Sequence, residues 1–161
     1  MQVVNRKSRL WKYLADEIKG LIVDGEHLLT LVEKSPIKGV SDYSFLVFPF
    51  AKAYEGFLKR LFLDLDMVTE DEYYGEHIRI GKVLDPFYRE KDKSVYEKIK
   101  KHTQGGRELS EKLWYAWRHG RNQVFHYFPH NFRKLDYEEA FELVGRFAEA
   151  MEEVVDVFEL E

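Results

Sequence analysis

The sequence SDYSFLVFPFAKAYEGFLKRLFLDL, residues 41–65, predicts a long helix, because its large apolar residues recur at intervals of three and four. Ser41 or Asp42 is the expected cap at its start. Pro49 lies within the helix and predicts a kink or an irregular first section. The side chains expected on the buried face are Tyr43, Leu46, Val47, Phe50, Tyr54, Phe57, Leu58, Leu61 and Leu65.

Similar spacing occurs on both sides of this stretch. Residues 8–33 predict a first helix that ends at Ser35-Pro36, since the residue before a proline avoids helical backbone angles. Residues 107–119 predict a later helix that ends in a positive-φ turn at Gly120. A last helix is expected from Asp136, which can form a capping box with Glu139. The first helix has a narrow apolar stripe that fits a seam within a bundle or between two copies: Trp11, Leu14, Ile18, Leu21, Gly25, Leu28 and Val32.

Residues 66–104 carry shorter signals. Thr69 and Glu72 indicate a helix start, whereas residues 78–84 fit a short helix and a strand equally well. Residues 92–101 predict a short basic helix, followed by a hinge at Gly105-Gly106. Together these elements predict one all-α domain over residues 1–161, a bundle of four or five longer helices with short helices between them.

The composition excludes several classes of site. The chain has 161 residues and no cysteine, which rules out disulfides, thiolate zinc sites and a cysteine nucleophile. No signal peptide or membrane-spanning run is evident, so we expect a soluble, cytoplasmic protein. The net charge of −4 means that any contact with nucleic acid must come from a local basic patch. The basic residues best placed for such a patch, or for an ordinary solvated face, are Lys98, Lys100, Lys101, His102 and Arg107.

The chemistry-bearing stretch is WYAWRHGRNQVFHYFP, residues 114–129. Arg121 supplies a permanent cation whose donors fit a phosphate. His126 supplies a proton that moves near neutral pH. Asn122 directly follows the arginine. A phosphodiester transfer needs both charge stabilisation and proton transfer in one place.

A second face of the helix predicted over residues 41–65 carries Phe45, Phe48, Lys52, Glu55 and Lys59. Aromatic side chains exposed beside charges indicate an interface, and with the narrow stripe of the first helix they predict a homodimer. Taken alone, Glu55 also fits an ordinary surface carboxylate paired with Lys59 one turn away.

The Arg121-Asn122-x3-His126 spacing resembles the R-x4-6-H signature of the HEPN superfamily, whose ribonucleases place Asn, Asp or His directly after the arginine. The segment AYEGFLKRLF, residues 53–62, is similar to the second helix of the HEPN domain of RNase LS-type toxins. In that family this helix supplies an active-site glutamate, which matches Glu55. It also supplies a basic residue one turn earlier, which matches Lys52, although the family residue is usually arginine.

The resemblance implies a HEPN-like helical bundle, from about Ser41 to the C-terminus, that cleaves RNA without a metal or cofactor. It implies that Arg121, His126 and Glu55 are catalytic and that Lys52 and Asn122 bind substrate. The neighbouring 2′-hydroxyl attacks the phosphate, and two protomers pair so that both motifs line one cleft. The implied partners are RNA, a second copy and an antitoxin protein, and the implied role is that of a toxin or defence ribonuclease.

Other interpretations of these residues remain. Arg121 can pair with Glu108 or Glu111 while His126 packs under Trp114 or Trp117, which is simply a capped helix end. The histidines His119, His126 and His130 can form a metal site, although Pro129 disrupts their helical spacing and no acid lies among them.

Two functional alternatives remain as well. A HEPN toxin paired with a nucleotidyltransferase antitoxin carries a tyrosine two places after the histidine, where this chain has Phe128. The chain can also be an inactive HEPN-like module that serves binding or dimerisation.

Overall fold

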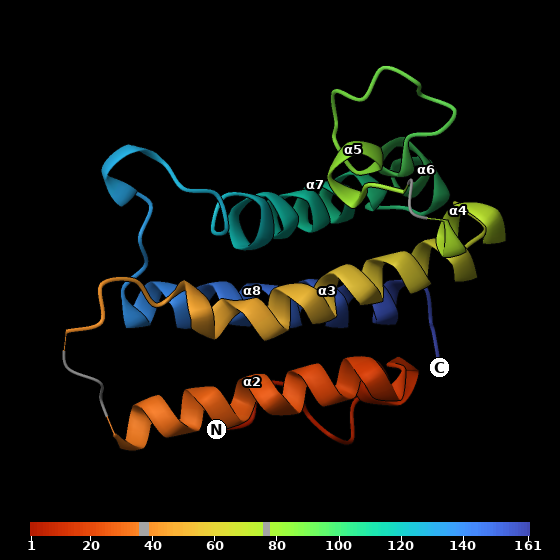
Figure 1. Ribbon diagram of the computed structural model, residues 1–161. Coiled ribbons are helices and arrows are strands. Elements are labelled where there is room, and N and C mark those ends of the chain that lie inside the picture. The colour runs from red at the N-terminus through yellow and green to blue at the C-terminus, as the bar shows by residue number, and fades with distance from the viewer. Residues whose placement is uncertain (36–38, 76–77) are drawn as a thin grey trace.

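The computed structural model describes residues 1–35, 39–75 and 78–161, and all regular structure in these ranges is helical (Figure 1). This confirms the predicted all-α class. The α-helices are α1 (Arg9–Tyr13), α2 (Asp16–Lys34), α3 (Ser44–Asp64), α4 (Glu70–Tyr74), α5 (Ile80–Val83), α6 (Val95–His102), α7 (Gly106–Ala116) and α8 (Tyr137–Val157). A π-helical turn, η1 (Trp117–Asn122), continues α7, and a 3-10 turn, η2 (Pro129–Asn131), precedes α8.

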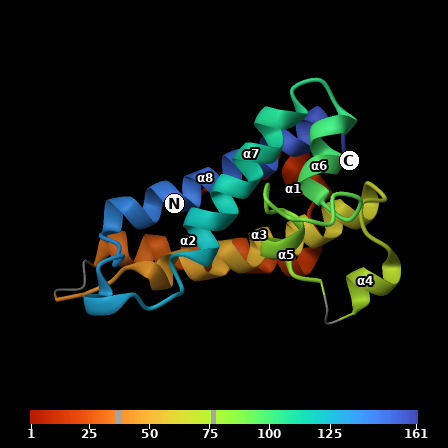
Figure 2. The ribbon, with the colours of Figure 1, turned by 90° about the horizontal axis from the view of Figure 1, so that it is seen from above.

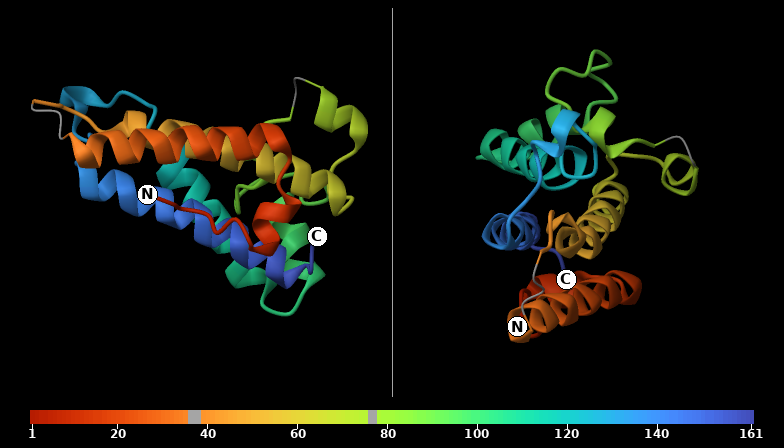
Figure 3. Two further views of the ribbon diagram at one scale, coloured as in Figure 1. Left: turned by 90° about the horizontal axis from the view of Figure 1, so that it is seen from below. Right: turned by 60° about the vertical axis from the view of Figure 1, so that its left-hand side comes forward.

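The long helices form layers, with α3 and α8 between α2 on one side and α7 on the other (Figures 1 and 3). Apolar residues from Val4 to Val155 form one buried cluster between these layers. α3 is the central element because α2, α8 and η1 all pack against it. Within the described ranges, no helix has the length and apolar character needed to span a membrane.

α3 follows the predicted helix closely, and most of its expected buried face lies in the core. It begins at Ser44 and runs without interruption to Asp64, so Pro49 does not break it. Pro49 is only the sixth residue of the helix, where the structure needs to forgo just one backbone hydrogen bond. The ring of Phe50 fits against the bare backbone of Gly25 in α2, since a Cβ there would lie 2.4 Å from the ring.

The helix predicted over residues 8–33 is two helices, α1 and α2, so the prediction of one continuous helix was wrong. Leu14 and Ala15 have extended backbone angles and separate them. The break allows α1 to pack on α8 while α2 packs on α3, which one straight helix would not do. α2 ends at Lys34, and the predicted stop at Pro36 lies outside the described residues.

The buried stripe of α2 also differs from the prediction. Leu28 is 36% exposed, and the neighbouring positions Glu26 and Leu29 are buried instead. The carboxylate of Glu26 accepts hydrogen bonds from the amides of Val3 and Val4 and pairs with Arg6. The N-terminal segment therefore covers this face of α2 and rotates the buried stripe, because a buried carboxylate needs these partners.

The shorter helices match their sequence signals in part. Both predicted capping boxes are present, Thr69 with Glu72 at α4 and Asp136 with Glu139 at α8. Within residues 78–84 the ambiguous signal is the short helix α5. The predicted basic helix is α6, which begins after the capping residue Ser94 rather than at residue 92.

A buried hydrogen bond joins α3 to α7. The hydroxyl of Tyr54 donates to the backbone carbonyl of Leu113 at 3.0 Å. Burial raises the pKa of Tyr54 well above its ordinary value, so the hydroxyl remains a donor at all physiological pH values. The Tyr54 ring also lies 4.8 Å from the ring of Phe147 in α8, and this residue therefore touches all three central helices.

The end of α7 differs from the prediction of a positive-φ turn at Gly120. The helical backbone continues through Asn122 as the wider π turn η1, and Gly120 does not have a positive φ. Gly120 is buried, and a Cβ there would lie 2.4 Å from the Phe147 ring. Glycine is therefore required for close packing of η1 on α8 rather than for a turn.

Replacing Gly120 with alanine should destabilise the protein by about 1–3 kcal/mol, because the new methyl group overlaps the buried Phe147 ring. Gly145→Ala is the matched control, since that glycine lies in α8 with no atom within 4 Å of the new Cβ. The control should gain up to about 1 kcal/mol from helix propensity. Urea unfolding of both variants measures the difference, and equal stability would contradict the packing role of Gly120.

The carboxylate of Asp42 ties the start of α3 to the segment before α8. It accepts hydrogen bonds from the amides of Ser44 and Leu135 and from the side chain of Asn131. Partial burial by itself raises the pKa of Asp42, but these hydrogen bonds outweigh it and hold the pKa below its usual value.

Because the folded state lowers this pKa, the stabilisation from Asp42 is complete above the unfolded pKa of about 4 and is lost as the pH falls through the folded value. Asp42→Ala should cost about 1–2 kcal/mol near neutral pH. Urea unfolding between about pH 3 and about pH 7 measures the linkage. A difference between wild type and variant that does not shrink toward low pH would contradict this assignment.

Candidate functional site

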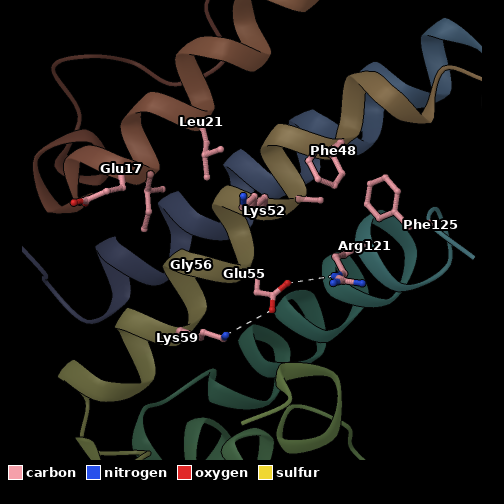
Figure 4. Close-up of a pocket in the computed structure, with 11 residues that line it drawn as sticks. Glu17, Leu21, Phe48, Lys52, Glu55, Gly56, Lys59, Arg121 and Phe125 are labelled. Atoms are coloured by element: carbon pink, nitrogen blue, oxygen red, sulfur yellow. Dashed lines mark hydrogen bonds and ion pairs between the residues drawn. The ribbon is translucent and has the colours of Figure 1, made fainter. Parts of the chain in front are cut away.

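A groove of about 530 Å³ lies across α3, between α2 and the segment that begins at Arg121 (Figure 4). Its floor is apolar and its rim is charged. α2 contributes Glu17, Ile18 and Leu21; α3 contributes Phe48, Ala51, Lys52, Glu55, Gly56 and Lys59; Arg121 and Phe125 close the far side. The sequence analysis had named seven of these residues: Phe48, Lys52, Glu55, Lys59 and Arg121 as a charged and aromatic set, and Ile18 and Leu21 as part of the first apolar stripe.

Glu55 stands between two cations in this groove (Figure 4). Its Oε2 accepts a hydrogen bond from Nε of Arg121 at 3.3 Å, and its Oε1 lies 3.8 Å from Nζ of Lys59. The alternative pairing of Glu55 with Lys59 is thus present, but it accompanies the contact with Arg121 rather than replacing it. Residues 66 positions apart in sequence are brought together as predicted.

The guanidinium of Arg121 is oriented by two contacts. Nε binds Glu55, and the guanidinium carbon lies 5.4 Å from the centre of the Trp117 ring. Because Glu55 engages Nε, the two terminal nitrogens of the guanidinium point their donors elsewhere, and they are the donors that fit a phosphate. The alternative pairing of Arg121 with Glu108 or Glu111 does not occur, and Glu111 pairs with Arg107 instead.

His126 belongs to a separate pair. Its Nε2 lies 3.2 Å from Oδ1 of Asn122, one turn earlier in the chain. An amide oxygen only accepts, so this contact requires the His126 tautomer that carries its hydrogen on Nε2. The His126 ring is exposed, so it does not pack under Trp114 or Trp117.

The structure therefore places the predicted site residues in two neighbouring sets. Arg121 and Glu55 share the groove with Lys52, whereas Asn122 and His126 form an exposed pair outside its lining. The predicted convergence of Arg121, His126 and Glu55 is present within one copy of the chain only for Arg121 and Glu55. His126 makes no hydrogen bond to either of them among the described contacts.

Lys52 lies on the rim of the groove, one turn before Glu55 on α3 (Figure 4). Its side chain is exposed, and within residues 1–35, 39–75 and 78–161 it forms no ion pair. An exposed ammonium outside any ion pair is available to an anionic ligand.

Sequence reasoning missed Phe125, which closes the groove beside Arg121. Its ring packs edge-on against Phe48, with centroids 5.7 Å apart. The signal for it was the spacing of four residues from Arg121, which puts both side chains on one side of a helical segment. The predicted exposure of Phe45 and Phe48 is correct, at 40% and 56%.

Two other predicted features have different outcomes. Among the described residues, no three side chains of His, Asp or Glu are grouped to hold a metal ion, which removes the alternative at His119, His126 and His130. The basic run of α6 is largely engaged, since Lys98 binds the carbonyl of Met67 and Lys100 pairs with Glu97. That run is an ordinary solvated face.

Compared with models of protein families, with curated proteins and with solved structures, the chain matches none of them. The HEPN resemblance therefore stays a prediction that rests on the two short motifs.

The ion pair of Glu55 with Arg121 should contribute little to stability, because both side chains are about one-third exposed, 30% and 38%. Glu55→Gln should change the free energy of unfolding by less than about 1 kcal/mol. Glu26→Gln is the control with the same chemical change at a buried carboxylate, and it should cost about 1–3 kcal/mol. If Glu55→Gln were the more destabilising variant in urea unfolding, the carboxylate would serve the fold rather than the site.

Proposed function

We propose that the protein is a metal-independent endoribonuclease of HEPN type. The observation that carries the proposal is the ion pair of Arg121 with Glu55 in a groove adjoining the exposed pair of Asn122 and His126. A phosphate-binding guanidinium and a titratable imidazole thus occupy one short segment. Lys52 adds a further cation at the same groove.

In the proposed reaction the 2′-hydroxyl of RNA attacks the adjacent phosphorus and the bond to the 5′-oxygen breaks. The guanidinium of Arg121 stabilises the charge of the phosphorane. One proton leaves the 2′-hydroxyl and one is added to the leaving 5′-oxygen; His126 makes one of these transfers and a water molecule makes the other. Glu55 is a positioning residue, because it holds Arg121 by Nε. The products are a 2′,3′-cyclic phosphate and a 5′-hydroxyl.

In this proposal a homodimer brings a histidine to the groove of each copy. In a single copy, His126 lies outside the groove that holds Arg121 and Glu55. Two copies related by a two-fold axis bring both motifs to one cleft, so that each Arg121 works with the partner copy's histidine. The exposed rings of Phe45 and Phe48 are the apolar surface that supports such pairing.

The biological role proposed is that of a cytoplasmic toxin or defence ribonuclease held in check by an antitoxin protein. The role is carried by the similarity of residues 53–62 to the RNase LS-type toxins. The alternative is an inactive helical module, which the exposed Phe45 and Phe48 also support.

Purified protein should cleave single-stranded RNA in EDTA and leave 2′,3′-cyclic phosphate ends. His126→Ala should lower kcat by at least about 100-fold, since proton transfer contributes about that much or more. Glu55→Gln should lower it less, and Lys112→Ala, which lies outside the lining of the groove and pairs with Glu153 of α8, is the control that should keep full activity. Wild type that binds RNA without cutting it, or cuts only with added metal, would contradict the mechanism.

Mixing two inactive variants tests the shared cleft. Arg121→Ala and His126→Ala protomers that exchange into mixed dimers should regain about a quarter of wild-type activity, because each mixed dimer keeps one intact pairing across the interface. Sedimentation checks that each variant remains a dimer. No recovery of activity in confirmed mixed dimers would show that Arg121 and His126 act within one copy.

A further inference from the structure

A second groove, of about 360 Å³, lies on the opposite side of the Arg121–His126 segment from the first. It is bounded by this segment, by the chain that leads into α8 and by the first turns of α8 itself. The residues of its lining that bear on ligand binding are His119, Gln123, Phe132, Arg133, Lys134 and Arg146.

One short segment separates the two grooves. Arg121 and Phe125 line the first groove, whereas His119 and Gln123 line the second. Each pair is spaced by four residues, so each occupies its own side of the helical turn. The hydrogen-bonded pair of Asn122 and His126 falls between these two sides and is exposed. A strand that crosses this pair therefore has a groove on either side of it.

The charge of the segment differs from that of the whole chain. Residues 118–134 contain four arginine or lysine residues and no aspartate or glutamate, in a chain of net charge −4. Within the described part of the chain, neither Arg133 nor Lys134 forms an ion pair. These two cations of the groove are therefore available to a polyanion.

The acids that line the second groove are already engaged. Glu142 pairs with Arg146 at 2.6 Å. Glu139 accepts the amide of Asp136 at 2.9 Å in the capping box of α8. With Arg133, Lys134 and Arg146 set against Glu139 and Glu142, the charged residues of the lining leave one net positive charge, with His119 taken as neutral.

Aromatic rings accompany these cations. The side chain of Phe132 is 64% exposed, and the guanidinium of Arg133 lies 4.2 Å from the ring of Phe128 and 5.6 Å from that of Phe132. Exposed rings beside a cationic groove stack on unpaired bases, a mode that requires single-stranded nucleic acid.

We propose that the second groove binds the nucleotides of single-stranded RNA that flank the cleaved phosphate. Arg133 and Lys134 contact backbone phosphates, and Phe132 stacks on a base. The identity of the cleaved phosphate rests on the proposed function, but binding in this groove does not require cleavage.

Binding is measured by fluorescence anisotropy of a labelled oligouridylate in EDTA, with His126→Ala present in every protein so that no strand is cut. The added double variant Arg133→Ala/Lys134→Ala should weaken binding by about tenfold and reduce the slope of log affinity against log salt by about 1.4, since each phosphate contact contributes about 0.7. Arg133→Gln/Lys134→Gln, which keeps most of the side-chain length, should have the same effect. Phe132→Leu should weaken binding by about fivefold or more.

Two controls match these changes. Lys100→Ala/Lys101→Ala removes the same charge from α6, which lies at the opposite end of the molecule from η2 (Figures 1 and 2). Phe87→Leu alters an aromatic ring that is 86% exposed elsewhere. Both should bind as the parent does.

Some results would overturn the inference even if the protein cleaves RNA. Unchanged affinity and salt slope in both double variants would contradict the proposed phosphate contacts of Arg133 and Lys134, provided that the thermal unfolding of the variants matches that of the parent. A duplex of the same length that binds as tightly as the single strand would remove the stacking contact. The wild type could also prove unable to cut RNA while the Arg133 and Lys134 changes still weaken binding. That result would support RNA binding in the second groove and contradict only the proposed reaction.

Discussion

The packing of the Phe147 ring between Tyr54 and Gly120 is the constraint on which the site depends. This contact joins α3, α8 and η1 in the core, and the Tyr54 hydroxyl adds a hydrogen bond to α7. Glu55 follows Tyr54 and Arg121 follows Gly120, so the two residues of the ion pair are each adjacent to a buried anchor. In the wider π turn, Gly120 is buried in the core while the Arg121 side chain lines the first groove. Such turns recur at functional sites.

The elements that could be predicted from sequence are those in which local chemistry decides the structure. α3 and the capping boxes of α4 and α8 follow from spacing and from side chains that bond their own backbone. The failures arise from distant contacts. The rotated stripe of α2 depends on Glu26 meeting the N-terminal amides, and the backbone at Gly120 depends on a ring in α8. Neither partner is visible within a window of a few residues.

The candidate site could also be predicted only in part from the sequence. Arg121, Glu55 and Lys52 share a groove because their motifs lie on helices whose packing is set by apolar residues. Phe125 and the second groove were missed, since they depend on how the chain leaves η1 and returns to α8. Asp42 controls this return by binding both Asn131 and the amide of Leu135. The positions of Arg133 and Lys134 therefore depend on the Asp42 carboxylate. This carboxylate precedes Asn131 by 89 residues and Leu135 by 93 residues in the sequence.

The difference between Lys52 and Arg121 follows from what each can do for a phosphate. A guanidinium donates two parallel hydrogen bonds and fixes orientation, whereas an ammonium acts as a mobile point charge. Arg121 is held by Glu55 and Trp117, while Lys52 is exposed without an ion pair in the described ranges. One guanidinium, that of Arg121, suffices to orient one phosphate, and a second cation such as Lys52 need only neutralise charge. The lysine at position 52 is thus compatible with the proposed reaction, in which Arg121 supplies the orienting contact.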